Sequence, residues 1–526
     1  MTTIGRRGLV LGAAALAAPK VHAAESARVL RFMPQIDLAF IDPHTSTTNI
    51  TRNHGGLVFD QLYGTDSNFR GQPQMAEGHV VEADGLTWRI KLRDGLRWHD
   101  GEPVLARDCV ASIKRWGQRD VLGMELLAIS NEISAADDRT IVFRLKRPFP
   151  MLPEALGKPG AFMPAMMPER LALTDPFKPV KDLIGSGPYR FKADERMQGV
   201  RNVYERFEAY VPRPNGTPDR GAGPKITHFD RVIWTTMPDV GTAFAALQKG
   251  EQDWWEYAAH DLVPAIKRDP KLRAEVLETE GEFKLVRFNH LIPPFNRPEM
   301  RRVILQAVDQ SDFVNAVAGI DSGLQRTGVG FFPPGVPAAN DAGMDRLRTP
   351  MTEAAAKAAL AAAGYRGERI VQVSPGDYPN VKAASEVLAD LLKRIGINLD
   401  YQTTDWATMT TRVSKKDPIE AGGFHIHMLS IPGLALFSPL VNSRLRGNDT
   451  VEAGWYHSDK YEDIRRSWVS TTDPAEQNKF ARAIQLEAME TVPFVPCGVT
   501  MQPSAWRSDL TGILPGVAKF WNVRRG

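Results

Sequence analysis

The chain has 526 residues, of which 43% are hydrophobic and 24% are charged, so its composition excludes a largely disordered protein. This length exceeds a single compact core and predicts two or three domains of about 100–200 residues each. The formal net charge of +3 falls to about zero when Arg6, Arg7 and Lys20 of the N-terminal segment are set aside, so no basic stripe indicates nucleic acid as a partner.

The first 23 residues read as an export signal and not as part of the fold. The stretch MTTIGRRGLVLGAAALAAPKVHAAE combines a charged start, an apolar run of small residues and a small-residue cleavage site in VHA (21–23). Arg6 and Arg7 directly before the apolar run resemble a twin-arginine (Tat) leader, with an ordinary Sec signal as the alternative. The run is too short to anchor the chain across ~30 Å of hydrocarbon. We therefore assign 1–23 to a Tat-like signal peptide and expect a periplasmic protein.

Residues 55–150 predict a small antiparallel sheet with a helix. LTWRIKLR (86–93) alternates between apolar and polar or charged residues, and Asp-Gly pairs on both sides provide the positive φ that tight hairpin turns need. A helix with an apolar stripe follows over 105–116, and RTIVFRLK (139–146) is a second alternating strand.

Strand–helix–strand units follow, which are typical of a parallel sheet covered by helices. The first runs from HFDRVIWTTM (228–237) through a helix over 239–250 to QDWWEY (252–257). The second runs from RIVQVS (369–374) through a helix over 384–396 to INLDY (397–401). The pattern predicts two α/β lobes with an antiparallel insertion, and a chain that crosses between the lobes more than once.

Sequence signatures of catalysis are missing. The chain contains no G-x-S-x-G, H-E-x-x-H, C-x-x-C or G-x-x-x-x-G-K-[ST] motif, and Cys109 and Cys497 are expected to be buried thiols. His425 and His427 in GFHIHM would share one face of a strand and could contact a ligand or a metal. The alternative is a pair of ordinary polar residues, because no third ligand lies nearby in the sequence. We expect no catalytic residue, no metal site and no cofactor.

Several stretches resemble one family. LRDGLRWHDGEPVLARDCVASIKRW (92–116) is similar to the signature of family 5 solute-binding proteins of ABC transporters, which include dipeptide, oligopeptide and nickel binding proteins. Other family stretches match in the same order: GSGPYRF (185–191), FNHLIPPFNRPEMRRVILQAVDQ (288–310), LAAAGY (360–365) and DWATMTTRV (405–413). Each match is weak alone, whereas the ordered set is specific and covers most of residues 28–500.

The resemblance implies an α/β fold, a two-lobed periplasmic binding protein of type II with an extra antiparallel subdomain. The implied divisions are 1–23 for the signal peptide, 24–50 with 185–284 and 491–526 for the first lobe, 51–184 for an inserted subdomain and 285–490 for the second lobe. The implied function is capture of a peptide-like or other small solute, without catalysis, and its delivery to an inner-membrane ABC permease with its ATPase subunits. We expect a monomer.

The candidate ligand-binding residues are mostly aromatic. QDWWEY lies at the carboxyl end of a predicted parallel strand, where open α/β sheets place their ligands, and adjacent side chains of a strand point to opposite faces. We expect Trp255 and Tyr257 at the cleft and Trp254 with Glu256 on the other face, with burial of both tryptophans as the alternative. The remaining candidates are Trp406 from the opposite lobe, His427, Asp37 and Arg326.

One stretch departs from the family. Peptide-binding relatives commonly hold the ammonium group of the ligand with an aspartate in a loop resembling G-D-x-x-D-P, whereas HMLSIPGLALFSPLVNS (427–443) contains no acid. Because an unpaired buried ammonium is costly, we expect a ligand that is neutral, acidic, blocked at its N-terminus or differently oriented. The alternatives to this function are a secreted Tat-dependent enzyme, either hydrolase or oxidoreductase, and a metal or metallophore carrier of the same family.

Overall fold

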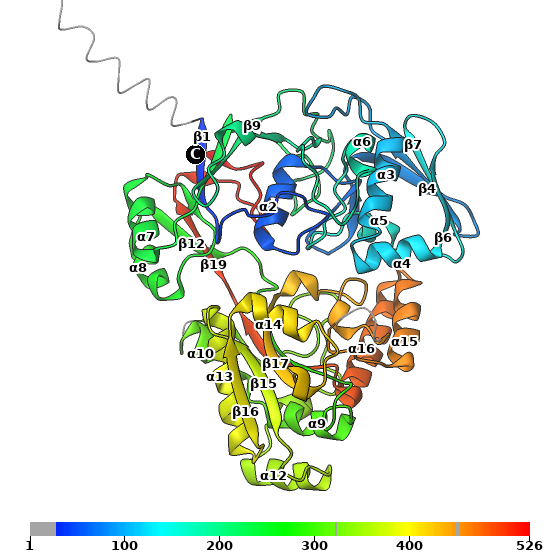
Figure 1. Cartoon of the computed structure of the whole chain (residues 1–526). Helices are drawn as coiled ribbons and strands as arrows, with labels where there is room; N and C mark the ends of the chain where they lie inside the picture. Colours follow the sequence, from blue (N-terminus) through cyan, green and yellow to red (C-terminus); the bar gives the residue numbers. More distant parts are fainter. Residues whose placement is uncertain (1–27, 321–322, 449–452) are drawn as a thin grey trace, which may run out of the picture.

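The computed structural model describes residues 28–320, 323–448 and 453–526. The predicted signal peptide, residues 1–23, lies outside the described residues. The described chain forms two lobes, each built around its own sheet, and a smaller antiparallel sheet that is attached to the first lobe (Figure 1). No helix within these described ranges is both long and apolar enough to cross a membrane.

The first lobe is built on a seven-stranded mixed sheet. Its central strand, β1, is parallel to both neighbours, while the outer strands pair in antiparallel fashion. In sheet order the strands are β12 (Leu272–Val276), β19 (Pro503–Arg507), β11 (Trp254–Trp255), β1 (Val29–Met33), β10 (Arg231–Thr235), β9 (Arg201–Arg206) and β8 (Tyr189–Phe191). Its main helices are α2 (Asn49–Val58), α7 (Val240–Lys249) and α8 (Val263–Arg268).

The predicted helix over 239–250 is confirmed as α7, and its ends show why it forms. The carboxylate of Asp239 accepts the backbone N–H of Thr242 at 2.7 Å, which caps the first turn. Gly250 ends the helix with a φ of 76°, a left-handed conformation that glycine adopts without a steric penalty. α7 packs on β11 and β19, so it covers one face of the first sheet.

The inserted subdomain contains the predicted antiparallel sheet, with several helices where the sequence predicted one. Along β5, Trp88 and Ile90 are buried whereas Arg89 and Lys91 are exposed, so the alternation in the sequence does mark an inner and an outer face. In sheet order the strands are β4 (Ala76–Val81), β5 (Thr87–Leu92), β7 (Thr140–Leu145) and β6 (Ser130–Ala135). The other elements are β2 (Tyr63–Thr65), β3 (Gly71–Pro73), α3 (Ala106–Trp116), α4 (Val121–Ile129), α5 (Leu152–Leu156) and α6 (Glu169–Ala172).

The second lobe contains a six-stranded mixed sheet. The predicted unit β15–α13–β16 is confirmed, because β15 and β16 pair in parallel and α13 joins them. In sheet order the strands are β14 (Gln325–Arg326), β18 (Phe494–Thr500), β13 (Glu282–Phe288), β17 (Ile426–Pro432), β15 (Ile370–Pro375) and β16 (Leu399–Thr404). The helices are α9 (Pro298–Ala307), α10 (Gln310–Ala318), α11 (Asp345–Arg348), α12 (Glu353–Ala362), α13 (Pro379–Arg394), α14 (Trp406–Val413), α15 (Asp459–Val469) and α16 (Pro474–Thr491). Near the C-terminus β20 (Leu510–Thr511) pairs with β21 (Arg524–Arg525) outside both large sheets.

The chain crosses between the two large sheets twice. Residues 277–281 connect β12 to β13, and residues 501–502 connect β18 to β19. The predicted boundary at 490 therefore differs from the structure, in which β18 belongs to the second sheet. The apolar run VPFVPCG indicates a strand, but an apolar pattern does not say which sheet the strand joins.

The predicted boundary at 50 differs in a similar way, because it divides α2. Ile50, Leu57 and Val58 of this helix pack with Leu30 and Phe32 of β1 in one hydrophobic core. α2 is thus part of the first lobe, and it lies on the side of that lobe that faces the second (Figure 1).

Candidate functional site

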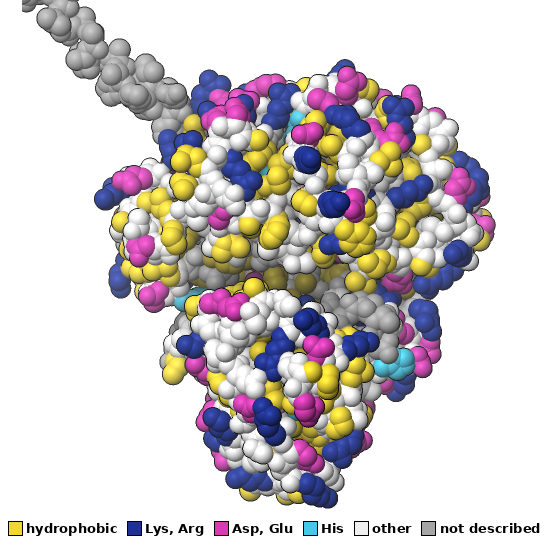
Figure 2. All heavy atoms as spheres, viewed as in Figure 1, with side chains coloured by type: hydrophobic (Ala, Val, Ile, Leu, Met, Phe, Trp, Pro, Cys, Tyr) yellow, Lys and Arg dark blue, Asp and Glu magenta, His cyan; other side chains and the backbone are white. Residues whose placement is uncertain are grey.

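In each lobe, the end of the sheet that lies next to the crossing segments faces the space between the lobes. Glu282, the first residue after a crossing, pairs with the last residues of β17 and β18, namely Pro432 and Thr500. On the first-lobe side, Val276 pairs with Pro503 where the other crossing begins. The carboxyl ends of parallel strands are where open α/β sheets bind ligands. Figure 2 shows the hollow between the lobes, with hydrophobic side chains along the adjoining surface of the first lobe.

The first-lobe wall near the crossings carries a paired arginine. A guanidinium nitrogen of Arg52 lies 3.3 Å from a carboxylate oxygen of Glu278, and the hydroxyl of Tyr257 donates to the same oxygen at 3.4 Å. Asn49, at the start of α2, donates to the Tyr257 hydroxyl at 3.5 Å. Burial raises the pKa of the Glu256 carboxyl to about 7, although that carboxylate accepts the backbone N–H of Gln35 at 2.9 Å. This wall is polar and already internally hydrogen-bonded.

The second-lobe wall carries two aromatic rings at the ends of parallel strands. Tyr378 follows β15 and Trp406 follows β16, and their rings meet edge to face with centroids 5.1 Å apart. The backbone N–H of Trp406 donates to Asp377 at 2.8 Å, which fixes the start of α14. Burial and the nearby carboxylate of Glu282 raise the pKa of Tyr378 to about 12, so Tyr378 lies near the crossing segment. Such rings offer a broad apolar surface with a polar edge.

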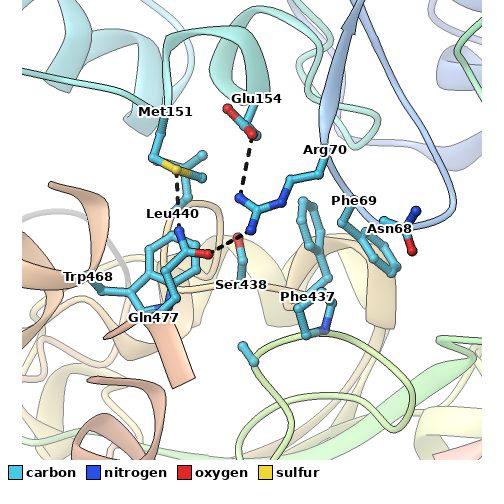
Figure 3. Close-up of a pocket in the computed structure, with 12 residues that line it drawn as sticks. Asn68, Phe69, Arg70, Met151, Glu154, Phe437, Ser438, Leu440, Trp468 and Gln477 are labelled. Atoms are coloured by element: carbon cyan, nitrogen blue, oxygen red, sulfur yellow. Dashed lines mark hydrogen bonds and ion pairs between the residues drawn. The ribbon is translucent and has the colours of Figure 1, made fainter. Parts of the chain in front are cut away.

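The inserted subdomain and the second lobe are also in direct contact. Phe69 of the inserted subdomain stacks on Phe437 of the second lobe, with centroids 4.7 Å apart. Arg70 donates to the side chain of Gln477 at 3.1 Å. Figure 3 shows these residues around a cavity of about 30 Å³. That volume holds about two water molecules, so in this arrangement of the lobes the cavity is too small for a peptide. We call this contact region the interlobe seam.

An ion cluster joins the lobes beside this seam. The carboxylate of Glu125 in α4 accepts two hydrogen bonds from Arg465 in α15, at 3.2 and 2.6 Å, and lies 3.4 Å from Arg446. Arg147 of the subdomain lies 3.4 Å from the same carboxylate. Burial acts to raise the pKa of Glu125, but the three guanidinium groups outweigh it and lower that pKa. We call Glu125, Arg446 and Arg465 the interlobe latch.

The structure corrects the expected placement of Trp255. β11 is an inner strand whose two faces are both covered, so the adjacent tryptophans enter two different cores. Trp254 is fully buried against Phe32, with its indole N–H donating to Ser504 at 2.7 Å. Trp255 is 5% exposed and packs with Leu247 of α7. Neither tryptophan reaches the cleft, whereas Tyr257, two residues beyond the strand, lies in the first-lobe wall.

The other candidates are dispersed. Trp406 lies at the cleft edge of the second lobe, and Asp37 lies in the loop that follows β1. Arg326 is exposed on the edge strand β14 and donates to the carbonyl groups of Gly323 and Gln325. His427 is buried near the start of β17, at the end of the sheet that lies away from the cleft.

The two predicted histidines have no ligating neighbours. Burial lowers the pKa of His427 to about 3, and neither ring nitrogen has a hydrogen-bond partner among the described residues. His425 accepts the backbone N–H of Val371 at 2.9 Å. Within residues 28–320, 323–448 and 453–526, no group of three or more His, Cys, Asp or Glu side chains could hold a metal ion.

The sequence analysis missed Arg52, Glu278 and Tyr378. Tyr378 could have been found, because it directly follows the predicted strand 369–374 and therefore lies at a carboxyl edge. Arg52 and Glu278 belong to a helix and a crossing segment that are distant in the sequence, and no local pattern pairs them.

The comparisons with known proteins identify the family. The profile described as "Bacterial extracellular solute-binding proteins, family 5 Middle" matches residues 71–430. The chain therefore belongs to the family 5 bacterial extracellular solute-binding proteins, as the sequence resemblance predicted. Members of this family are non-enzymatic components of transporters, so the prediction that the chain is not an enzyme is confirmed.

Two relatives show the range of similar sequences. The chain is 35% identical, over 99% of its length and 100% of the relative, to the probable peptide ABC transporter periplasmic-binding protein y4tO of Sinorhizobium fredii. It is 23% identical to the glutathione-binding protein GsiB of Escherichia coli K12, over 90% of this chain and 89% of the relative.

Solved structures confirm the two-lobed fold. The PBP AgaA from A. tumefacien R10, in complex with agropinic acid, superimposes with a TM-score of 0.78 and 22% identity, over 95% of this chain and 99% of that one. The periplasmic binding protein DppA from Helicobacter pylori, in complex with the peptide STSA, gives a TM-score of 0.77 and 19% identity, over 96% and 99%. The fold is that of type II two-lobed periplasmic binding proteins, as expected.

Proposed function

We propose that this protein is the periplasmic binding component of an ABC importer and captures a peptide-like or other small organic solute between its two lobes. The observation that carries the proposal is the pair of sheet edges that face each other across one cleft, with Tyr257 and Arg52 on one wall and Tyr378 and Trp406 on the other. The relatives named for peptide and glutathione support a solute of this size and kind.

The solute is held by closure of the lobes. In the closed arrangement the latch at Glu125 lies away from the crossing segments (Figure 1). The Phe69–Phe437 stack lies closer to them, because Arg220 contacts both the Phe69 ring and Glu280 of a crossing segment. A solute that contacts both walls adds contacts that an open form does not have, so it shifts the population toward the closed form. We infer that the permease, with its ATPase subunits, recognises this closed form, and that the chain reaches the periplasm as a monomer after cleavage of a Tat-like signal peptide.

The charged groups of the cleft argue against an unmodified ammonium as the main anchor. Each carboxylate near the crossings already has one donor: Glu278 has Arg52, Glu280 has Arg220, and Glu282 has the hydroxyl of Ser430 at 3.3 Å. The second carboxylate oxygen of Glu280 is buried and has no hydrogen-bond partner among the described residues. The facing segment of the second lobe, 431–438, contains no acid. This supports the prediction of a neutral, acidic or N-blocked solute.

The direct test is to denature protein purified from the periplasm and identify any released solute by mass spectrometry. The solute is then titrated by calorimetry into the wild type, Tyr378→Ala and the control Phe177→Ala, which removes a ring that is 66% exposed on the first lobe. We expect Tyr378→Ala to bind at least tenfold more weakly and Phe177→Ala to bind as the wild type does. Absence of any released solute, together with no binding across a panel of di- and tripeptides, would refute the function.

A further inference from the structure

Two lysines from other segments, Lys225 and Lys519, lie near one face of α2, and the cleft walls described above do not include them. Arg52 and Gly56 are four residues apart and share this face. The ammonium nitrogen of Lys519 lies 4.0 Å from the place that a Cβ on Gly56 would occupy. Both lysines lie near the ring of Trp521, with Lys225 Nζ 4.7 Å and Lys519 Nζ 5.2 Å from its centroid.

Each neighbouring cation has a carboxylate partner, whereas Lys519 has none in the part of the chain that the structure describes. Lys225 Nζ lies 2.7 Å from Asp60, and Arg52 and Arg220 are paired with Glu278 and Glu280 at 3.3 and 2.6 Å. Among the described residues no carboxylate oxygen lies within 4.0 Å of the Lys519 ammonium.

The surroundings of Lys519 are therefore electropositive. Burial, followed by the charges of Lys225 and Arg52, lowers the pKa of Lys519 to about 7, while Glu278 acts in the opposite direction. Arg220 lowers the same pKa further. An anion placed here would meet the one cation of this group that has no described carboxylate partner, in a setting where charge interactions are stronger than in water.

The position of this group relates it to the cleft. Arg52 and Arg220 hold the two glutamates of the crossing segment 277–281. The guanidinium of Arg220 also lies 4.7 Å above the ring of Phe69, which stacks on Phe437 of the second lobe. Lys519 thus lies among residues that run from the crossing to the interlobe seam, along the first-lobe side of the cleft. Lys519 is partly buried, and it lies beside α2, which is on the side of the first lobe that faces the second (Figure 1).

We propose that Lys519 is the centre of an anion subsite on the first-lobe side of the cleft and binds a carboxylate group of the solute, with Lys225, Arg52 and Arg220 supporting it through space. The inference rests on the proposed function. It adds that the solute carries a negative charge and that Lys519 binds the charged group. No described carboxylate occupies the position, so the negative charge is left for the solute to supply.

The test uses pairs of ligands that differ only in this charge. Di- and tripeptides with a free C-terminal carboxylate are compared with their C-terminal amides, each with a free and with an acetylated amino group, by thermal shift and calorimetry. We expect the wild type to bind the best carboxylate at least tenfold more tightly than its amide, and Lys519→Met to reduce that ratio to about one. The control Lys416→Met removes an exposed lysine whose ammonium lies 5.6 Å from the Trp455 ring in the second lobe, and should keep the ratio.

Two results would overturn the subsite: an unchanged carboxylate-to-amide ratio in Lys519→Met, or a wild type that binds no carboxylate of the panel while the natural solute proves to be uncharged or cationic. These results differ from failure of the proposed function. The subsite alone fails if amides or neutral solutes bind as tightly as carboxylates do. The function fails if the protein neither yields a solute nor binds any member of the panel.

Discussion

Replacing Glu125 with glutamine is expected to shift the protein toward an open form. The carboxylate is the only acid of the latch that comes from the first lobe, and it accepts two hydrogen bonds from Arg465, whose side chain is 1% exposed. Glutamine keeps the size of the side chain but removes the charge. Two guanidinium groups of the second lobe, those of Arg465 and Arg446, then lose their carboxylate partner across the cleft.

The size of the effect follows from the burial of the pair. Removing one partner of a fully buried ion pair costs about 3–5 kcal/mol. The Glu125 side chain is 12% exposed, and Arg446 keeps Glu462 at 3.0 Å, so we discount the cost to about 2 kcal/mol. Since about 1.4 kcal/mol is a factor of ten, the ratio of closed to open protein should fall about 25-fold. Solute affinity should weaken by a similar factor if the solute-free protein is mainly open.

The assay measures the distance between the lobes. Spin labels are attached to Leu173→Cys in the first lobe and Leu486→Cys in α16, positions that are 73% and 49% exposed. The native thiols of Cys109 and Cys497 are fully buried and should not react. Glu125→Gln should lengthen the distance distribution and weaken binding of the recovered solute.

The control for this experiment is Glu132→Gln, which removes an exposed glutamate of the same subdomain that pairs with Arg144 and not with the second lobe. It should change neither the distance nor the affinity. A Glu125→Gln protein with the distances and the affinity of the wild type would show that the latch does not contribute to closure.

Three further changes test the interior of the protein. Trp255→Ala should cost about 3–5 kcal/mol of unfolding free energy in urea titrations, because it empties a core position; unchanged stability would contradict its burial. His427→Leu should leave solute binding unchanged and make the protein less sensitive to acid, because a buried histidine with a pKa near 3 destabilises the fold as pH falls below about 6.5; equal losses of melting temperature between pH 7 and 5 in both proteins would contradict this. Below pH 7 the charged Lys519 lowers the free energy of unfolding, because its pKa in the folded protein, about 7, is lower than its pKa in the unfolded chain. This loss of stability becomes smaller as the pH rises toward the unfolded pKa. The charges facing Lys519 are Lys225, Arg52, Arg220 and Glu278, so Lys519→Met should melt higher than the wild type at pH 6 and by a smaller margin at pH 9, and a margin that grows with pH would refute the argument.

The elements that the sequence predicted are those with strong local signals. The helix over 239–250 has both a capping aspartate and a terminal glycine, and the strand 86–93 has hairpin turns on both sides, so neither depends on distant contacts. The unit over 369–401 was predicted for the same reason, since its helix carries a regular apolar stripe.

The parts that the sequence could not predict depend on how separate segments come together. Alternation within QDWWEY shows that Trp254 and Trp255 point to opposite faces, but it does not show that β19 and β1 flank the strand and that both faces are covered. The sequence likewise does not show that β18 belongs to the second sheet, because this depends on its pairing with β13 and β14. The charged residues of the cleft come from α2, the crossing segment and the C-terminal return, and no local spacing connects Arg52 with Glu278 or Lys519 with Lys225.

The arrangement of the interlobe contacts constrains how tightly the solute can be held. The closed form gains the latch at Glu125, the Phe69–Phe437 stack and the Arg70–Gln477 hydrogen bond even without a solute. If these contacts were much stronger, the empty protein would close and a permease that recognises the closed form would receive no solute. If they were absent, the whole cost of closure would reduce solute affinity. The cost of about 2 kcal/mol assessed for Glu125→Gln lies between these limits, so solute contacts with both walls still decide how far the protein closes.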